Sequence, residues 1–206
     1  MRVVPLLLLV SGCGIGAMHQ ATLMGQCAAD DAACSRRHPL APIAIGARFY
    51  PEVAADMAGT STPNLRLESA APDVLAVEAG TLVAKHAGTS AVLISTDDGS
   101  VVDFVHVWVA PVTQISLARR DGDRLSGTIG LAVGEDLTIA PALWNGAQRL
   151  AGDADLAWSS SNDTAVTVLR DGSTDRRRIR ARAPGVATLT VALGSATTSI
   201  GVEVVP

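Results

Sequence analysis

The feature that most restricts how this chain can fold is an internal repeat, in which four short segments recur in the same order. The two copies of a segment lie 88 to 97 residues apart, and the separation changes only between segments. One structural unit is therefore built twice, and the length differences fall in loops. The paired segments are 43–49 with 131–137, 67–77 with 158–168, 84–94 with 181–191, and 105–109 with 200–204.

Each repeated segment alternates in the way of a β-strand with one buried face. In 185–193, for example, Leu189 and Val191 share one parity, whereas Thr188 and Thr190 share the other. No span has the 3.6-residue apolar stripe of an amphipathic helix. Residues that accept a positive φ separate the strands, at Asp97-Asp98-Gly99-Ser100, Asn145-Gly146 and Asp171-Gly172. The pattern predicts an all-β fold.

The second repeat resembles the bacterial immunoglobulin-like group 2 family, and residues 131–205 carry the resemblance. The matching positions are Trp158, Ser159, Ser160, Val166, Val168, Gly185, Ala187 and Leu189. The first repeat, 43–109, matches less well, because Leu67-Glu68 stands where the family has Trp-Ser. The resemblance implies two tandem immunoglobulin-like β-sandwiches, at residues 40–111 and 112–206, of a kind used in surface proteins as spacers or binding modules.

The N-terminal segment has the layout of an export signal, because Arg2 precedes the uncharged apolar run Val3–Val10. That run is shorter than the ~20 residues of a membrane-spanning helix. The next residues complete Val10-Ser11-Gly12-Cys13, which resembles the lipobox of bacterial lipoproteins.

The lipobox resemblance implies that residues 1–12 are a signal peptide. It also implies that lipid is transferred to the Cys13 thiol and that the chain is then cleaved before Cys13, which becomes the acylated first residue of the mature protein. The membrane would then be a partner through the lipid anchor. The alternative is an ordinary secretory signal that leaves Cys13 as a thiol. Gly14 is not the aspartate that retains lipoproteins at the inner membrane in the family pattern. The expected location is therefore the bacterial cell envelope, with the outer membrane favoured if the cell is Gram-negative.

Two further cysteines, Cys27 and Cys34, remain after Cys13 is set aside. An even number in an oxidising compartment predicts a disulfide that closes a short loop. A metal site is the alternative, but Cys-x6-Cys has no recognised ligand spacing. Residues 13–39 otherwise lack a sustained strand or helix period, so we expect them to form a lipid-anchored tether.

Catalytic and cofactor signatures are absent from the sequence, which has four histidines in scattered positions and no nucleotide, zinc or serine-hydrolase motif. We therefore expect no enzyme, no cofactor and no metal. Asp121-Gly122-Asp123 lacks the other ligands of a calcium loop and is interpreted as a solvated turn. The net charge is −4, which gives no case for nucleic acid.

The first candidate surface is a cationic row, because four arginines share one parity of a strand while Ile179 and Ala181 share the other. The row consists of Arg176, Arg178, Arg180 and Arg182. It would suit phosphate or carboxylate groups on a polysaccharide. The structural alternative is that the row keeps a strand soluble and discourages edge pairing.

The second candidate surface is an aromatic row on one strand, formed by Phe104, His106 and Trp108. These three residues have the outward parity, whereas the valines at 105, 107 and 109 have the core-facing parity. Aromatic side chains outside a core stack on sugars or pack on a protein partner. The alternatives are burial against the second repeat and an ordinary half-exposed strand.

Two functions are therefore expected from the sequence. The first is a non-catalytic envelope lipoprotein that acts as a structural, spacer or adhesion module. The second is carbohydrate or cell-wall polysaccharide binding through the aromatic or the arginine row. Either function would give the protein a protein or polysaccharide partner in the cell envelope.

Overall fold

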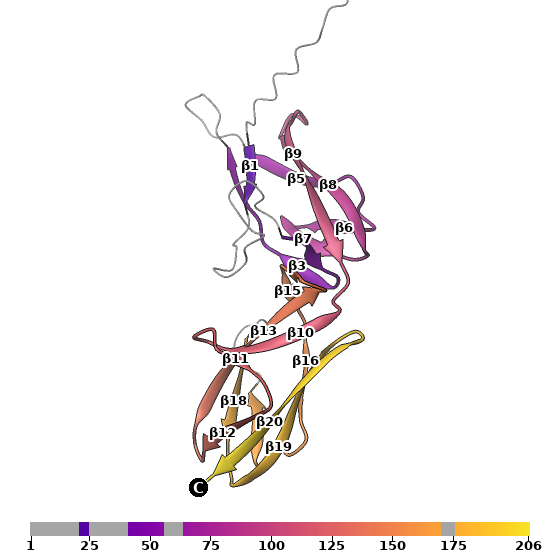
Figure 1. Ribbon diagram of the computed structural model, residues 1–206. Helices are drawn as coiled ribbons and strands as arrows, with labels where there is room; N and C mark the ends of the chain where they lie inside the picture. The colour runs from indigo at the N-terminus through magenta and orange to yellow at the C-terminus, as the bar shows by residue number, and fades with distance from the viewer. Residues whose placement is uncertain (1–20, 25–40, 56–63, 170–175) are drawn as a thin grey trace, which may run out of the picture.

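The computed structural model describes residues 21–24, 41–55, 64–169 and 176–206, and these residues form β-strands and no helix. Figure 1 shows an elongated molecule with one β-rich body above another and the C-terminus at the lower end. Within the described residues no helix has the length and apolar character needed to cross a membrane. The predicted all-β class is confirmed. Cys13, Cys27, Cys34, the predicted signal and most of the predicted tether lie outside the described residues.

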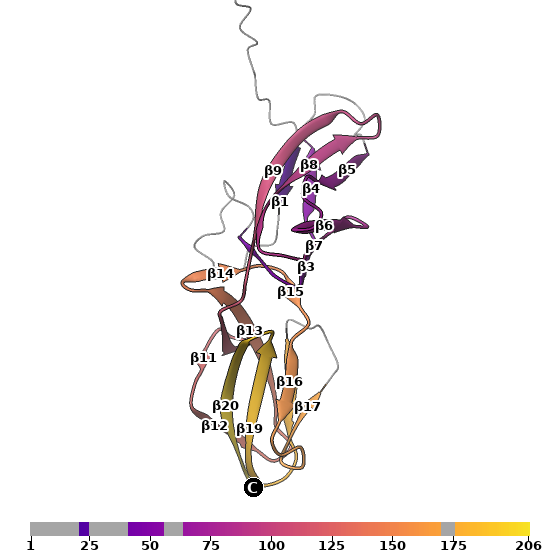
Figure 2. The same ribbon diagram turned by 90° about the vertical axis from the view of Figure 1, so that its right-hand side faces the viewer.

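The second repeat folds into two sheets. The strand order of the first sheet is β11-β10-β13-β18-β17 with β14 on β13, and that of the second is β12-β20-β19-β16. These are the two sheets of an immunoglobulin-type sandwich, and Figure 2 shows β19 and β20 side by side in the lower body. The strands are β10 (Gln114–Arg119), β11 (Arg124–Leu125), β12 (Thr128–Ala132), β13 (Asp136–Asn145), β14 (Gln148–Leu150), β16 (Ala157–Ser160), β17 (Val166–Leu169), β18 (Arg177–Ala181), β19 (Gly185–Leu193) and β20 (Ala196–Val205).

The first repeat has the same strand order, with one sheet β2-β9-β8-β5 and a second in which β3, β7 and β6 are neighbours. Its first strand β2 runs parallel to its last strand β9, as β12 runs parallel to β20. The two predicted tandem sandwiches are therefore confirmed. The strands are β2 (Ile43–Ala44), β3 (Ala47–Phe49), β4 (Glu52–Ala55), β5 (Leu65–Ser69), β6 (Leu75–Glu78), β7 (Thr81–Ala84), β8 (Gly88–Thr96) and β9 (Val101–Ala110).

Two pairs of glycines show that the repeats share their turns. Gly46 and Gly134 have φ angles of 81° and 88°, and Gly88 and Gly185 have 151° and 152°. A Cβ on Gly88 would lie 3.2 Å from Val74 Cγ2. Glycine is the residue that adopts these angles without strain, so the sequence match reflects a shared backbone conformation.

The core lies between the two sheets of each sandwich and contains the residues of inward parity. Val92 on β8 and Leu189 on β19 occupy equivalent positions and are fully buried. Ile200, Val202 and Val204 on β20 are buried as well. The alternation seen in the sequence therefore assigns the buried face of these strands correctly.

One further strand, β1 (Ala21–Met24), pairs antiparallel with β4. It lies within residues 13–39, which the sequence analysis assigns to a tether. Four residues are too few to show a strand period, and their partner 52–55 follows much later in the chain. The pairing therefore has no signal in the local sequence.

The two sandwiches are joined by β15 (Asp153–Ala154), which belongs to the second repeat but pairs antiparallel with β3. In Figure 1 it lies between the two bodies. Just before it, the Ala44 amide donates to the Ala151 carbonyl at 3.0 Å, and the Ala151 amide donates to the Pro42 carbonyl at 2.8 Å. A segment of the second repeat thus extends the sheet of the first.

Gly152 occupies a position in this junction that has no room for a side chain. Its φ is 97°, and a Cβ there would lie 2.8 Å from Ala47 Cβ and 3.1 Å from Ile43 Cγ2. A side chain at this position would meet both strain and steric overlap. Glycine is therefore required for β15 to dock.

The covalent connection 111–113 is held by the β13–β14 hairpin. The Thr113 amide donates to the Trp144 carbonyl at 2.8 Å, and the Gly146 amide donates to Thr113 Oγ1 at 2.9 Å. Asn145 Nδ2 donates to the Pro111 carbonyl at 3.0 Å. The connection is thus bonded into the second sandwich, and together with β15 it fixes the junction at two places.

Candidate interaction face on strand β9

The aromatic row lies on the outward face of β9. Trp108 is 65% exposed and Phe104 is 56% exposed, and His106 between them is exposed too. The Phe104 and His106 rings meet edge to face, with centroids 5.5 Å apart and planes at 87°. The three predicted residues are therefore brought together on one surface.

The neighbouring strand β8 widens this face with small or apolar side chains. Across the β8–β9 ladder, Thr89 lies opposite Trp108, Ala91 opposite His106, and Leu93 opposite Phe104. These neighbours leave the rings uncovered because none is larger than leucine. Sequence reasoning missed them, since a register shift at Ile94/Ser95 breaks the simple pairing that the hairpin turn implies.

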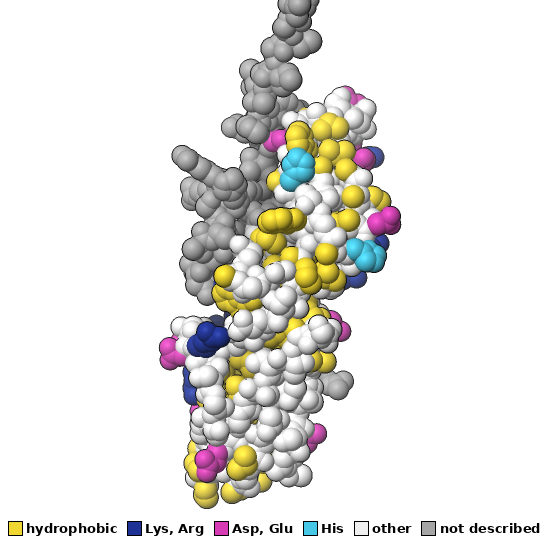
Figure 3. Space-filling view, turned by 45° about the vertical axis from the view of Figure 1, so that its right-hand side comes forward, with side chains coloured by type: hydrophobic (Ala, Val, Ile, Leu, Met, Phe, Trp, Pro, Cys, Tyr) yellow, Lys and Arg dark blue, Asp and Glu magenta, His cyan; other side chains and the backbone are white. Residues whose placement is uncertain are grey.

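Burial of the aromatic row against the second repeat was one predicted alternative, and it is wrong. The junction is made by β2, β3 and β15 together with the connection 111–113. The outward side of β9 does not contribute to it, which leaves Trp108 in solvent. In Figure 3 hydrophobic and histidine side chains gather over the first-repeat half of the molecule, whereas the second-repeat half is mostly white, the colour of the backbone and of the remaining side chains.

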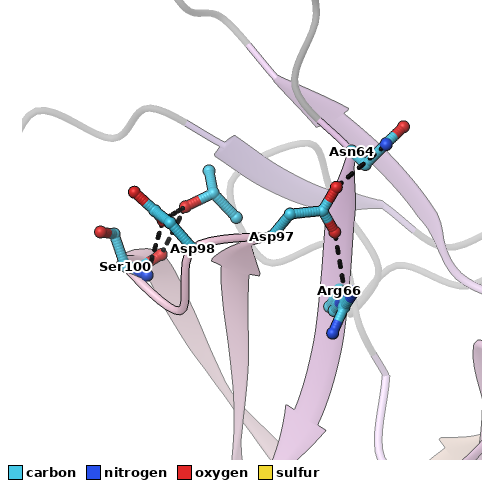
Figure 4. A network of polar contacts seen from close by, with 6 residues as sticks. Asn64, Arg66, Asp97, Asp98 and Ser100 are labelled. Carbon is cyan, nitrogen blue, oxygen red and sulfur yellow. Dashed lines mark hydrogen bonds and ion pairs between the residues drawn. The ribbon is translucent and has the colours of Figure 1, made fainter.

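A polar network fixes the end of the hairpin that carries β9 (Figure 4). Asp97 accepts hydrogen bonds from Asn64 Nδ2 and Arg66 Nε, each at 3.0 Å. Asp98 accepts from Thr96 Oγ1 and from the Ser100 amide, and these bonds lower the pKa of its carboxyl. The predicted turn at 97–100 thus ties β8 and β5 together where β9 begins.

The second repeat provides an internal comparison for the aromatic face. Gly88 pairs with Val109 in the first repeat as Gly185 pairs with Val204 in the second, so the two last strands are in the same register. Phe104, His106 and Trp108 then correspond to Ser199, Gly201 and Glu203. Because the same sandwich forms with small and charged residues at these positions, the fold does not require the aromatic rings.

The arginine row faces outward as predicted, but it is not a free cationic surface. Arg180 donates from Nε and Nη2 to the two carboxylate oxygens of Asp136, each at 2.7 Å, and Arg178 Nη1 lies 3.6 Å from the same carboxylate. The Arg180 hydrogen bonds hold the pKa of the Asp136 carboxyl below its usual value. Two of the four arginines therefore share a structural partner.

The edge-protection interpretation of that row is wrong as well. Strand β18, which carries Arg178 and Arg180, lies between β13 and β17, so it is not an edge strand. Arg182 lies just past the end of β18 and is exposed. Arg176 lies before the start of β18, near Trp144 and Arg149, on a different part of the sheet surface.

The residues with acid, base or metal-binding chemistry are scattered over the described part of the chain. Nowhere in 21–24, 41–55, 64–169 or 176–206 do three histidine, cysteine, aspartate or glutamate side chains gather around one point. His86 Nδ1 donates to the Asp73 carbonyl at 2.6 Å, which is a structural contact. The Asp123 amide donates to Asp121 Oδ1 at 3.4 Å within the turn that follows β10.

Comparison with known proteins gives distant likenesses. No family model matches the chain, and no curated protein matches it. Among solved structures it is similar to domains 4 and 5 of the S-layer protein SbsC, at 19% identity over 77% of this chain and 83% of that one, with a TM-score of 0.35.

Two adhesins are similar at the same level. For the Escherichia coli adhesin FdeC the identity is 15% over 92% of this chain and 64% of that one, with a TM-score of 0.36. For the Yersinia pseudotuberculosis adhesin InvE it is 11% over 91% and 59%, with a TM-score of 0.36. This chain spans less than two thirds of either adhesin structure. Values this low assign no function to this chain.

Proposed function

We propose that the protein is a non-catalytic lipoprotein of the bacterial cell envelope whose two immunoglobulin-type sandwiches act as a structural, spacer or adhesion module. The observation that carries the proposal is the exposed face of Phe104, His106 and Trp108 on β9. An exposed aromatic cluster favours contact with a partner, because rings of this size gain free energy when they leave water.

The junction supports the same proposal. A rigid spacer keeps its units in a fixed orientation, whereas most connections between domains leave them free to move. Here β15 adds strand pairing and Gly152 adds a close contact to the covalent connection. The β9 face is therefore held in one orientation relative to the far end of the second sandwich.

Carbohydrate binding through the same face is the second candidate. The observation in its favour is that Trp108 stands beside Thr89, so one side of the indole is not walled in. An open aromatic ring packs on the apolar side of a sugar while polar neighbours reach its hydroxyls. The two candidates share residues and differ in the chemistry of the partner.

Loss of the aromatic face is expected to abolish most attachment without weakening the fold. We predict that beads coated with the full chain attach to bacterial cells whose own copy of the gene is deleted, and that F104S/W108S beads do not. Because both rings are largely exposed, the variant should melt within a few degrees of the wild type. Val186→Ser, on the equivalent exposed face of the second repeat, is the matched control and should attach normally.

Equal attachment by F104S/W108S and wild-type beads would contradict the adhesion role of this face. A glycan array then separates the two candidates. Selective binding of one sugar structure, lost in F104S/W108S and kept in Val186→Ser, favours carbohydrate as the partner. An array without signal, together with attachment to cells, favours a protein partner.

Lipid attachment at Cys13 is expected from the preceding Val10-Ser11-Gly12. Cells that express the chain with a labelled fatty acid should incorporate label into the wild type and not into Cys13→Ser. The variant should also move from the membrane fraction to the soluble fraction, because several acyl chains anchor a protein far more firmly than one. Label retained in Cys13→Ser would show that the lipobox interpretation is mistaken.

A further inference from the structure

A hollow of about 870 Å³ lies on the outer face of the sheet formed by β10, β13 and β14 in the second repeat. Its floor consists of small side chains that pair across the two central strands, Ser116 with Ala142 and Ala118 with Ala140. Larger side chains surround this floor on both sides. The result is a groove with a shallow, flat base, of the size that proteins use for small ligands.

Among the residues that the structure describes, the lining of the groove contains five arginines and one carboxylate. Arg119, Arg120 and Arg124 come from the β10–β11 hairpin. Arg149 and Arg176 come from the opposite side and already have polar or ionic partners within the protein. Within the described part of the lining, the acidic residue is Asp121. The guanidinium group stays protonated at any physiological pH, so the groove concentrates positive charge on a chain whose net charge is −4.

Trp144 lies at one end of the groove and is fixed from two directions. Its Nε1 donates to Ser116 Oγ at 2.9 Å, and its carbonyl accepts from the Thr113 amide at 2.8 Å. The indole is half-buried, so part of its surface is available to a ligand. The groove thus combines forked cationic donors with one immobilised aromatic ring.

We propose that this groove binds an acidic oligosaccharide, with arginines on its carboxylate or phosphate groups and Trp144 against a sugar ring. Arginine pairs with such groups through two parallel hydrogen bonds, which gives both strength and geometry. Arg120 and Arg124 are exposed at the hairpin side of the small-residue floor, where they can reach the acidic groups of such a ligand.

Nucleic acid fits the same groove less well. A polynucleotide is recognised by proteins with a strongly basic surface that follows the phosphate backbone. In the second repeat, residues 112–206, basic and acidic residues are equal in number, ten of each, and the cations next to the groove on β18 are taken by Asp136. A short ligand with separated charges is therefore favoured over a long, densely charged one.

The test uses the full chain and isothermal titration calorimetry with two probes, hexagalacturonate and its fully methyl-esterified form, in which each carboxylate is replaced by an uncharged methyl ester. The wild type is expected to bind the acid and not the ester, with affinity that falls as salt is added. In R120Q/R124Q, where both residues are exposed, affinity should fall at least about tenfold, since hydrogen bonds to charged groups are lost. The control R48Q/R182Q makes the same charge change outside the groove and should bind as the wild type does.

Equal binding of the acid and the ester, equal weakening in the control, or no binding of either probe would overturn the proposal. Tighter binding of hexathymidylate than of hexagalacturonate would overturn it in favour of nucleic acid. The groove and the β9 face share no residue, so F104S/W108S should bind hexagalacturonate normally. Failure of this proposal is thereby distinguishable from failure of the proposed adhesion role.

Discussion

Replacing Gly152 with valine is expected to release β15 from the first sandwich while leaving both sandwiches folded. Valine would be forced into a backbone conformation with φ of 97° and would place its Cβ 2.8 Å from that of Ala47. Strain of about 1–2 kcal/mol and overpacking of about 1–3 kcal/mol would oppose docking. The chain can avoid both by undocking, so the cost cannot exceed the free energy of the junction.

Hydrogen exchange read by mass spectrometry measures this release. Amide protection at 41–49 and 150–154 should fall by more than about tenfold, which corresponds to ~1.4 kcal/mol. Protection in β8 and β19, which lie outside the junction, should be kept. The radius of gyration from small-angle scattering should rise as the two bodies separate.

Gly130→Val is the matched control for this experiment. Gly130 lies on a strand, has no positive φ, and has open space where a Cβ would be. Valine is favoured in strands, so this variant should retain the junction. If Gly152→Val and Gly130→Val showed the same amide protection and the same radius of gyration, the junction would not depend on β15 docking.

The strands and their buried faces could be predicted from the sequence because they depend on local alternation. Leu189 and Val191 face inward for the same reason that Thr188 and Thr190 do not, and a duplicated pattern doubles the evidence. Gly46 and Gly134 could be matched because a shared turn requires the same positive φ. None of these features depends on a contact far away in the chain.

What could not be predicted depends on distant partners. Asp136 lies 44 residues from Arg180, and no local pattern indicates that the two form a bidentate pair. The pairing of β15 with β3 joins residues of different repeats. Comparison of the two repeats aligns equivalent positions within each copy, so it gives no indication of a contact between the copies. Parity predicts that Trp108 points away from the core of its sandwich. Whether the second sandwich covers it depends on where the junction between the two sandwiches forms, and Trp108 is exposed.

The arginine groove could not be predicted from the sequence for a related reason. Arg120, Arg124 and Arg149 belong to different strands or turns, and the pairing of β10, β11, β13 and β14 brings them around one floor of small residues. The row of alternate arginines at 176–182 is conspicuous in the sequence, yet two of its members are committed to Asp136. Local charge periodicity singled out Arg178 and Arg180 but not their partner Asp136, whereas the arginines of the groove come together through the fold.

Replacing Leu189 with alanine is expected to cause the largest loss of stability among these variants. Leu189 is fully buried between the sheets of the second sandwich and pairs with Ile200 on β20 and Ser160 on β16. Removing three buried carbons in a packed core costs about 3–5 kcal/mol. Val92 occupies the same position in the first sandwich and is equally buried, so Val92→Ala, which removes two carbons, should cost about 1–3 kcal/mol.

The location of the loss tests how the two sandwiches depend on each other. In urea, Leu189→Ala should lower the midpoint at which β19 loses amide protection. Protection at 41–49 should fall with it, because β15 docks only while β14 and β16 hold its ends. Val92→Ala should lower protection in β8 and at 41–49 and leave β19 unchanged, since β19 takes no part in the junction. Unchanged protection at 41–49 in Leu189→Ala at urea concentrations that unfold β19 would mean that the first sandwich holds its edge without β15, and that the strand contributes orientation but no stability.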